Sequence, residues 1–248
     1  GRTSPRVARP RRAAAASGAC PARPGRHPQT ACGSESWRGV CADVPLVAGA
    51  VEGSRGAVVH SWWHARRVDG LTLGGVTVAP LPVPSNQLGF NENERTGSSL
   101  LLENLPNDAV LLVTVGAANA NRRIDLLLQA VADDEVLAER VHLWAVGPST
   151  SQARSDLLRR AQKLGLKDQF AVTGRVTDSL LQEILARADI AAALRDPVLE
   201  GQSASVLTQL LSGTPVVVFD HGHYSELPDD VAVKVDPEDA LAGVCSAL

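Results

Sequence analysis

Two stretches of the sequence combine small, flexible residues with charged side chains, a pattern suited to anion binding. The first, residues 116–125 (GAANANRRID), places Gly116 after an apolar run and puts Arg122 and Arg123 at the expected start of a helix. Cations are unfavourable at a helix N-terminus because the macrodipole is positive there, and a bound anion would offset that cost. A solvated arginine pair with asparagine helix caps explains the same residues equally well.

The second stretch, residues 195–205 (RDPVLEGQSAS), carries Glu200 directly before Gly201 and several small residues. Backbone N–H groups that are free at a helix start, with no bulky side chains near them, bind phosphate. Glu200 is an acceptor suited to the hydroxyl groups of a sugar. The alternative is an ordinary helix cap at Ser203 or Ser205 beside a surface glutamate.

Alternating strands and helices must position these loops. The predicted strands are residues 110–115, 141–146, 170–172, 190–194, 215–219 and 231–235. The predicted helices are residues 124–132, 151–164, 179–187, 203–211 and a last one that begins at Pro237. This alternation indicates an α/β fold, a Rossmann-like, doubly wound parallel sheet covered on both faces. Ligands bind at the carboxyl ends of such strands, where both stretches lie together with a third loop, TGRV at 173–176, that could present backbone atoms to a base.

The residues before 98 have a different character. The first forty hold eight arginines and one acid, a formal charge of +7, whereas the rest of the chain carries −10. We expect residues 1–42 to be a disordered or artefactual basic leader because they contain too few large apolar residues to form a core. A nucleic-acid-binding arm is a weaker alternative. Residues 43–97 contain a short helix and two strand-like runs, and they end in a polar linker at 84–97 that we interpret as a domain boundary.

Composition excludes several classes of protein. The net charge of −3 argues against a general nucleic-acid binder, and the longest apolar runs fall far below the roughly 18 residues of a membrane span. The four cysteines lack C-x-x-C spacing, so we expect reduced thiols and a cytoplasmic protein. His221, His223 and Tyr224 are residue types of a metal or acid/base site, but no third metal ligand is evident, and we expect their loop to pack beside the donor site without a metal. His60 and His64 are read as an acceptor-side cluster or an aromatic plug.

Residues 110–236 resemble the nucleotide-sugar-binding half of the GT-B fold glycosyltransferases of the group 1 (family 4-like) type. The stretches that carry this resemblance are VGAANANRRIDLLLQA, HLWAVGP, LLRRAQKLGLKDQFAVTGRV, ILARADIAAALRDP and EGQSASVLTQLLSGTPVVVFDHGHYSELPDD. The last two are the most specific. Residues 43–83 look like the end of the family's N-terminal domain. Since methionine is absent as well, we expect a fragment with a truncated N-terminal remnant and a C-terminal domain, residues 98–248, that is also truncated.

The resemblance implies roles for individual residues. Arg122 takes the place of a lysine that contacts the donor diphosphate, and Glu200 matches the first acid of the family's E-x7-E motif, which contacts the donor sugar; these two are the expected catalytic residues. Thr208 stands where the second acid, which takes the ribose hydroxyls, is expected. The donor-binding residues implied are Gly116, Asn121, Arg175, Val176, Arg195, Gly201, Gln202, Ser203, Ala204, Ser205 and Thr208. Of these, Arg175 and Val176 would line the base pocket.

The resemblance implies a glycosyltransferase that moves a sugar from a nucleotide-diphosphate donor to an unknown saccharide, lipid or small-molecule acceptor. No cofactor is expected besides this substrate, and no nucleic-acid partner. The alternative is a catalytically silent nucleotide-binding or structural fragment of such an enzyme. A dinucleotide-binding oxidoreductase is disfavoured because no G-x-G-x-x-G follows a predicted strand.

Overall fold

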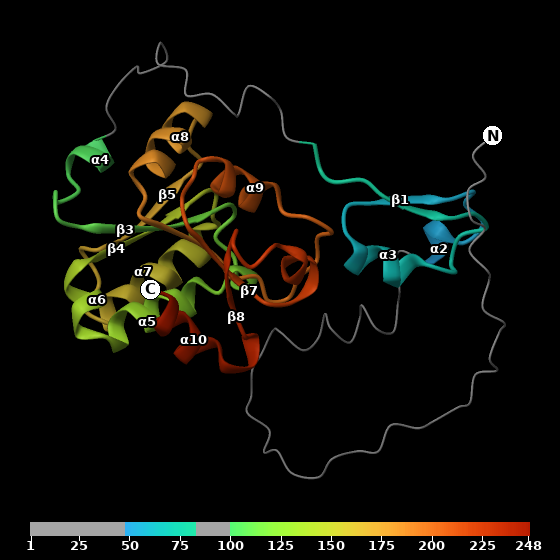
Figure 1. Cartoon of the computed structure of the whole chain (residues 1–248). Coiled ribbons are helices and arrows are strands. Elements are labelled where there is room, and N and C mark those ends of the chain that lie inside the picture. Colours follow the sequence, from blue (N-terminus) through green and yellow to red (C-terminus); the bar gives the residue numbers. More distant parts are fainter. Residues whose placement is uncertain (1–47, 83–99) are drawn as a thin grey trace, which may run out of the picture. The chain divides into compact units, whose positions relative to one another are not determined.

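The computed structural model describes residues 48–82 and 100–248 (Figure 1). The expectations for the basic leader at 1–42 and for the linker at 84–97 therefore lie outside the described residues. The first segment contains a short helix, α2 (Ala48–Val51), and two parallel strands, β1 (Ala57–Val59) and β2 (Val76–Val78), joined by helix α3 (Trp62–Val68).

A six-stranded parallel sheet forms the centre of the second segment. Its strands are β3 (Val110–Val115), β4 (Val141–Val146), β5 (Phe170–Gly174), β6 (Ile190–Ala193), β7 (Val216–Phe219) and β8 (Val233–Val235). They lie in the order β5-β4-β3-β6-β7-β8, and every neighbouring pair is parallel. The chain therefore builds outward from β3 to β5, returns to β6 on the other side of β3 and continues to β8. The loops after β3 and β6 diverge at this switch point, which is where such sheets bind ligands.

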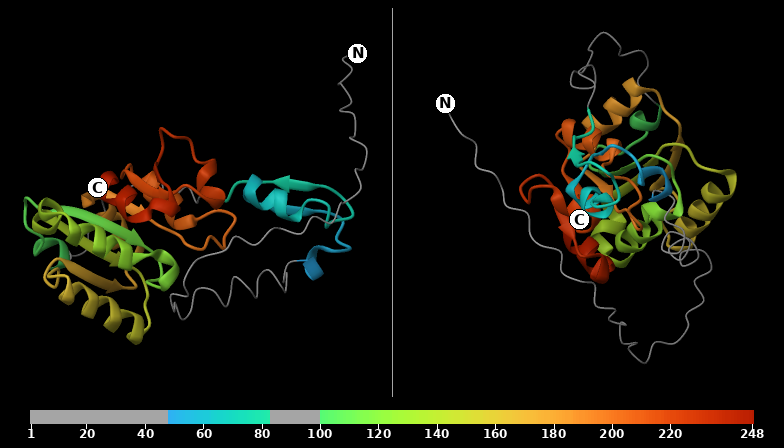
Figure 2. Two further views of the ribbon diagram at one scale, coloured as in Figure 1. Left: turned by 90° about the horizontal axis from the view of Figure 1, so that it is seen from below. Right: turned by 90° about the vertical axis from the view of Figure 1, so that its right-hand side faces the viewer.

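Helices cover both faces of the sheet, as the two further views in Figure 2 also show. The α-helices of this segment are α4 (Leu100–Glu103), α5 (Ile124–Asp133), α6 (Glu135–Arg140), α7 (Ser151–Lys163), α8 (Asp178–Arg187), α9 (Ala204–Leu211) and α10 (Ala240–Ala247). Three short 3-10 helices accompany them: η3 (Ala120–Arg122), η4 (Gly222–Glu226) and η5 (Pro237–Asp239).

Two apolar cores result from the alternation of side chains along the central strands. In β3, Leu112 belongs to the core under α5, α7 and α10, whereas Leu111 and Val113 belong to the core under α8 and α9. All three side chains are fully buried. A strand buried on both faces reads as a continuous apolar run, and this is why β3 was recognisable from sequence.

The predicted fold class is confirmed, and most boundaries agree within two residues. β3 and β4 match the prediction in full. Pro237 begins a 3-10 turn rather than the last helix itself, which starts at Ala240. Helices α3 and α6 were not predicted. Both are short: α3 has seven residues and follows the capping residue Ser61, and α6 has six residues and follows the capping residue Asp134.

Candidate functional site

The loop after β3 turns one arginine inward and its neighbour outward. Arg122 is the last residue of η3 and is only 5% exposed, whereas Arg123 adopts the left-handed conformation, with φ of 49°, at the N-cap position before α5. Arg123 is the one non-glycine residue with positive φ among the described residues. Gly116, with φ of 120°, leaves the space that the Arg122 guanidinium fills, because a Cβ there would overlap it. The pair predicted to flank a helix start is therefore divided between the interior and the surface.

The buried guanidinium of Arg122 is only partly satisfied. Its Nε donates to the Ala117 carbonyl at 3.1 Å, but its buried Nη1 has no hydrogen-bond partner within the described part of the chain. Burial lowers the pKa of Arg122 to about 10, and the positive charge of Arg195 lowers it as well. Arg122 still carries its charge at neutral pH. A buried cation with an unused donor is costly unless an anion binds there.

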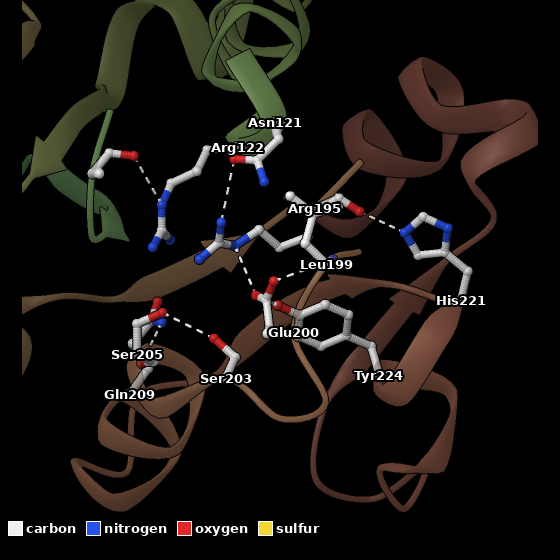
Figure 3. Close-up of polar contacts among 11 residues, drawn as sticks. Asn121, Arg122, Arg195, Leu199, Glu200, Ser203, Ser205, Gln209, His221 and Tyr224 are labelled. Carbon is white, nitrogen blue, oxygen red and sulfur yellow. Dashed lines mark hydrogen bonds and ion pairs between the residues drawn. The ribbon is translucent and has the colours of Figure 1, made fainter. Parts of the chain in front are cut away.

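The loop after β6 brings Arg195 and Glu200 next to Arg122. Arg195 Nε lies 3.2 Å from Glu200 Oε1, and Arg195 Nη1 donates to the Asn121 side chain at 3.3 Å (Figure 3). Arg195 thus links the acid of one predicted loop to the other predicted loop. Its side chain is only 15% exposed, so the pair lies in a region of reduced solvent screening.

Further contacts hold the two loops together. The Asp196 N–H donates to the Asn121 carbonyl at 2.9 Å, and Arg123 Nη1 pairs with the Asp196 carboxylate at 3.2 Å. Arg123 is therefore paired with Asp196, whereas the inward Arg122 forms no ion pair within the described residues. The predicted residues Asn121, Arg122, Arg195 and Glu200 are brought together by the structure.

The start of α9 faces the same region. Ser203 occupies the N-cap position, but in the described structure its side chain caps no backbone N–H of that helix. Its hydroxyl contacts the Ser205 hydroxyl at 3.1 Å instead, as Figure 3 shows. In α7, by contrast, the Thr150 side chain accepts from the Ala153 N–H at 3.1 Å. The first-turn N–H groups of α9 are thus left without the usual side-chain acceptor.

Three residues of the loop after β7, His221, His223 and Tyr224, lie beside the site, but the contact that Tyr224 makes with Glu200 was not predicted. Tyr224, fully buried in η4, donates its hydroxyl to Glu200 Oε1 at 3.1 Å. The His221 ring hydrogen-bonds the Arg195 carbonyl. His223 is buried, its Nε2 lacks a partner among the described residues, and burial lowers its pKa to about 4. The sequence offered a signal for this loop in its residue types and in its position after the buried strand β7.

The other predicted residues are distributed unevenly. Gly201 is buried against the His64 ring, and the Gln202 side chain accepts from the Leu81 N–H. The Thr208 hydroxyl donates to the carbonyl of Ala204, one turn earlier in α9, at 3.0 Å. Arg175 and Val176 follow β5, which β4 separates from β3. Arg175 is exposed and Val176 packs against the core under α8 and α9, so the structure does not join them to the Arg122 group.

Two kinds of feature are absent from the part of the chain that the structure describes. No group of three or more histidine, cysteine, aspartate or glutamate side chains there could hold a metal ion. Within the same residues, none of the helices combines the length and the apolar character that crossing a bilayer requires.

A comparison with protein families bears on the second segment. Residues 109–248 match the family model described as "Glycosyl transferases group 1". Curated protein sequences gave no match. Among solved structures, sucrose-phosphate synthase from Thermosynechococcus elongatus matches with a TM-score of 0.65 at 19% identity, covering 82% of this chain and 50% of that one.

Two further structures are similar in the same way. Anabaena Alr3699/HepE in complex with UDP-glucose has a TM-score of 0.66 at 16% identity, covering 86% of this chain and 57% of that one. An α,α-trehalose-phosphate synthase (UDP-forming) from Burkholderia vietnamiensis has a TM-score of 0.63 at 14% identity, covering 78% and 50%. The chain thus spans about half the length of these structures, and at such identities the likeness concerns the fold.

Proposed function

The chain belongs to the glycosyl transferases group 1 family, and from that premise we propose that it binds a nucleoside diphosphate sugar as the donor of a glycosyl transfer. One observation carries the proposal: a buried, charged guanidinium at Arg122 has an unused Nη1 donor and lies beside Arg195. A diphosphate would supply the missing acceptor and neutralise the charge.

The surroundings of Arg122 suit the remaining parts of such a donor. The first-turn N–H groups of α9 offer further donors to phosphate oxygens, since the Ser203 hydroxyl does not cap them in the described structure. Glu200 offers an acceptor for sugar hydroxyls. During transfer, negative charge develops on the departing diphosphate, and Arg122 together with the start of α9 would stabilise it.

The proposal also covers the acceptor, the nucleotide of the donor and the compartment of the cell. A saccharide, lipid or small molecule would take the sugar, and no cofactor would be needed besides the donor. UDP is the first nucleotide to try, because one of the structural relatives is a complex with UDP-glucose and another is a UDP-forming synthase. We also infer a cytoplasmic protein, since four cysteines without framework spacing fit reduced thiols.

A thermal-shift panel of UDP, GDP and ADP with their sugars tests donor binding, because a ligand that prefers the native state raises the unfolding midpoint. We expect at least one nucleotide to bind and Arg122→Ala to weaken that binding by tenfold or more. Arg187→Ala is the matched control, since Arg187 is bonded to Ala109 and Asp189 on the opposite edge of the sheet. Undiminished binding by Arg122→Ala would refute the assignment of the site.

Turnover separates the enzyme from a silent relative. Purified chain with the bound nucleotide sugar should release free nucleoside diphosphate when a suitable acceptor or water takes the sugar. A protein that binds the donor through Arg122 but yields neither transfer nor hydrolysis would support the alternative, a nucleotide-binding fragment without activity.

A further inference from the structure

Tyr224 contacts the site in a way that the sequence patterns did not predict. It lies in η4 after β7 and is fully buried, with its ring in the core under α8 and α9. Only its hydroxyl takes part in polar contacts: it donates to Glu200 Oε1 at 3.1 Å and hydrogen-bonds Ser203 as well. The buried ring of Tyr224 therefore holds its hydroxyl group in a position to donate to Glu200.

The two oxygens of Glu200 have different surroundings. Oε1 accepts the hydrogen bond of the Tyr224 hydroxyl and forms an ion pair with Arg195 Nε at 3.2 Å. Among the described residues, Oε2 receives only the Leu199 N–H, at the long distance of 3.3 Å. Figure 3 shows the carboxylate held between Arg195 and Tyr224. One oxygen is fixed by a cation and a phenol, and the other remains able to accept further hydrogen bonds.

We propose that Tyr224 is a positioning residue that fixes the Glu200 carboxylate so that Oε2 is presented to a hydroxyl group of the donor sugar. The inference rests on the proposed function and deepens it by assigning the recognition of the sugar, as distinct from the diphosphate, to the Tyr224–Glu200 pair. Burial raises the pKa of Tyr224, so the phenol remains a proton donor throughout the neutral range.

Removing the hydroxyl alone tests the proposal. Binding is measured for the pairs UDP and UDP-glucose, GDP and GDP-mannose, and ADP and ADP-glucose, and the pair with the tightest wild-type binding is used. Tyr224→Phe should lower affinity for the nucleotide sugar about tenfold, the size expected for a lost hydrogen bond to a charged group, while affinity for the diphosphate changes less than about twofold.

Thr214→Val is the matched control. It too removes a buried hydroxyl, one that donates to the Leu185 carbonyl at 3.0 Å, and it touches none of the site residues. It should change neither affinity. The proposal is overturned if Tyr224→Phe weakens both ligands of the pair equally, or neither.

Fluorine NMR gives a second readout, which keeps the Tyr224 hydroxyl and adds only one fluorine atom to its ring. Tyr224 is the only tyrosine in the chain, so biosynthetic 3-fluorotyrosine gives a single fluorine resonance next to Glu200. We expect the nucleotide sugar to move this resonance more than the diphosphate does, and Glu200→Gln to move it without ligand. Equal displacement by both ligands overturns the proposal even if Tyr224→Phe does not fold.

The two failures are distinguishable. If no pair binds the wild-type chain, the proposed function fails, and the role of Tyr224 falls with it. If the diphosphate binds through Arg122 but neither readout responds to the sugar, donor binding stands and only the role of Tyr224 is refuted.

Discussion

Replacing Arg122 by methionine should make the free protein more stable while removing its affinity for nucleotides. Folding places this guanidinium at 5% exposure, and its pKa falls from 12.5 to about 10. Because the folded-state pKa is depressed, the cost is fully present at every pH below about 10. Converted at about 1.36 kcal/mol for each tenfold change in the proton equilibrium, it amounts to about 3 kcal/mol.

The substitution also loses a favourable contact. The hydrogen bond from Nε to the Ala117 carbonyl contributes about 1 kcal/mol. Arg122→Met should therefore gain about 2 kcal/mol in the free energy of unfolding, as replacement of buried charges by apolar side chains often does. For a domain of this size, the midpoint of thermal unfolding should rise by about 4–8 °C.

Urea and thermal unfolding at pH 7.5, without ligand, measure the gain, and a nucleotide titration measures the loss. Arg187→Met is the matched control: Arg187 donates to the Ala109 carbonyl at 2.8 Å and pairs with Asp189 at 2.9 Å, so this variant should lose about 1–2 kcal/mol. The reasoning is refuted if Arg122→Met destabilises the free protein as Arg187→Met does, because the guanidinium would then be satisfied without an anion.

Three further outcomes follow from the site. Burial holds His223 neutral with a pKa of about 4, so the unfolded chain binds a proton at this residue first as the pH falls. The wild-type protein should therefore lose about 2 kcal/mol of unfolding free energy between pH 8 and pH 5. Urea titrations at both pH values should show this loss, and they should show that His223→Gln removes most of the pH dependence. Gly116→Ala should displace the Arg122 guanidinium and weaken nucleotide binding about tenfold or more by calorimetry. Gly165→Ala, also at positive φ but with no described atom within 4 Å of a new Cβ, should cost about 1 kcal/mol of stability and leave binding unchanged. Ser203→Ala should cost less than about 0.5 kcal/mol in thermal unfolding, against about 1 kcal/mol for Thr150→Ala, since only Thr150 caps its helix; an equal cost would show that Ser203 stabilises α9 after all.

The sheet could be predicted from sequence because its strands are buried on both faces. The continuous apolar run at residues 110–115 by itself predicts a buried strand, and helices around the sheet begin at recognisable capping residues. Short helices escaped prediction because one or two turns show no clear period. The six residues of α6 contain no buried side chain, so no apolar stripe marks them.

The site was predictable as a set of loops but not as a set of contacts. Parallel strands bring the loops after β3 and β6 to one edge, and this placed Arg122 and Glu200 together. Which of two adjacent arginines turns inward depends on the left-handed backbone at Arg123 and on the space at Gly116. The contact between Tyr224 and Glu200 spans 24 residues and depends on side-chain packing in the core. Composition and periodicity contain neither kind of information.

The middle of the sheet is joined by fewer backbone pairs than the strands beside it. β3 and β6 align over two residue pairs, Leu112 with Ile190 and Val113 with Ala191, whereas β3 and β4 align over six. At the carboxyl end of this seam, Asn121 and Arg123 fasten the β3 loop to the β6 loop.

A donor bound between these loops would therefore bridge the junction of the sheet that has the fewest aligned residue pairs. Occupancy should slow amide exchange along β6, on the far side of the seam, and protect the β3–β6 junction from cleavage by proteases. The bound ligand would then stabilise the sheet, and the polar groups that bind the donor would also hold the two loops together.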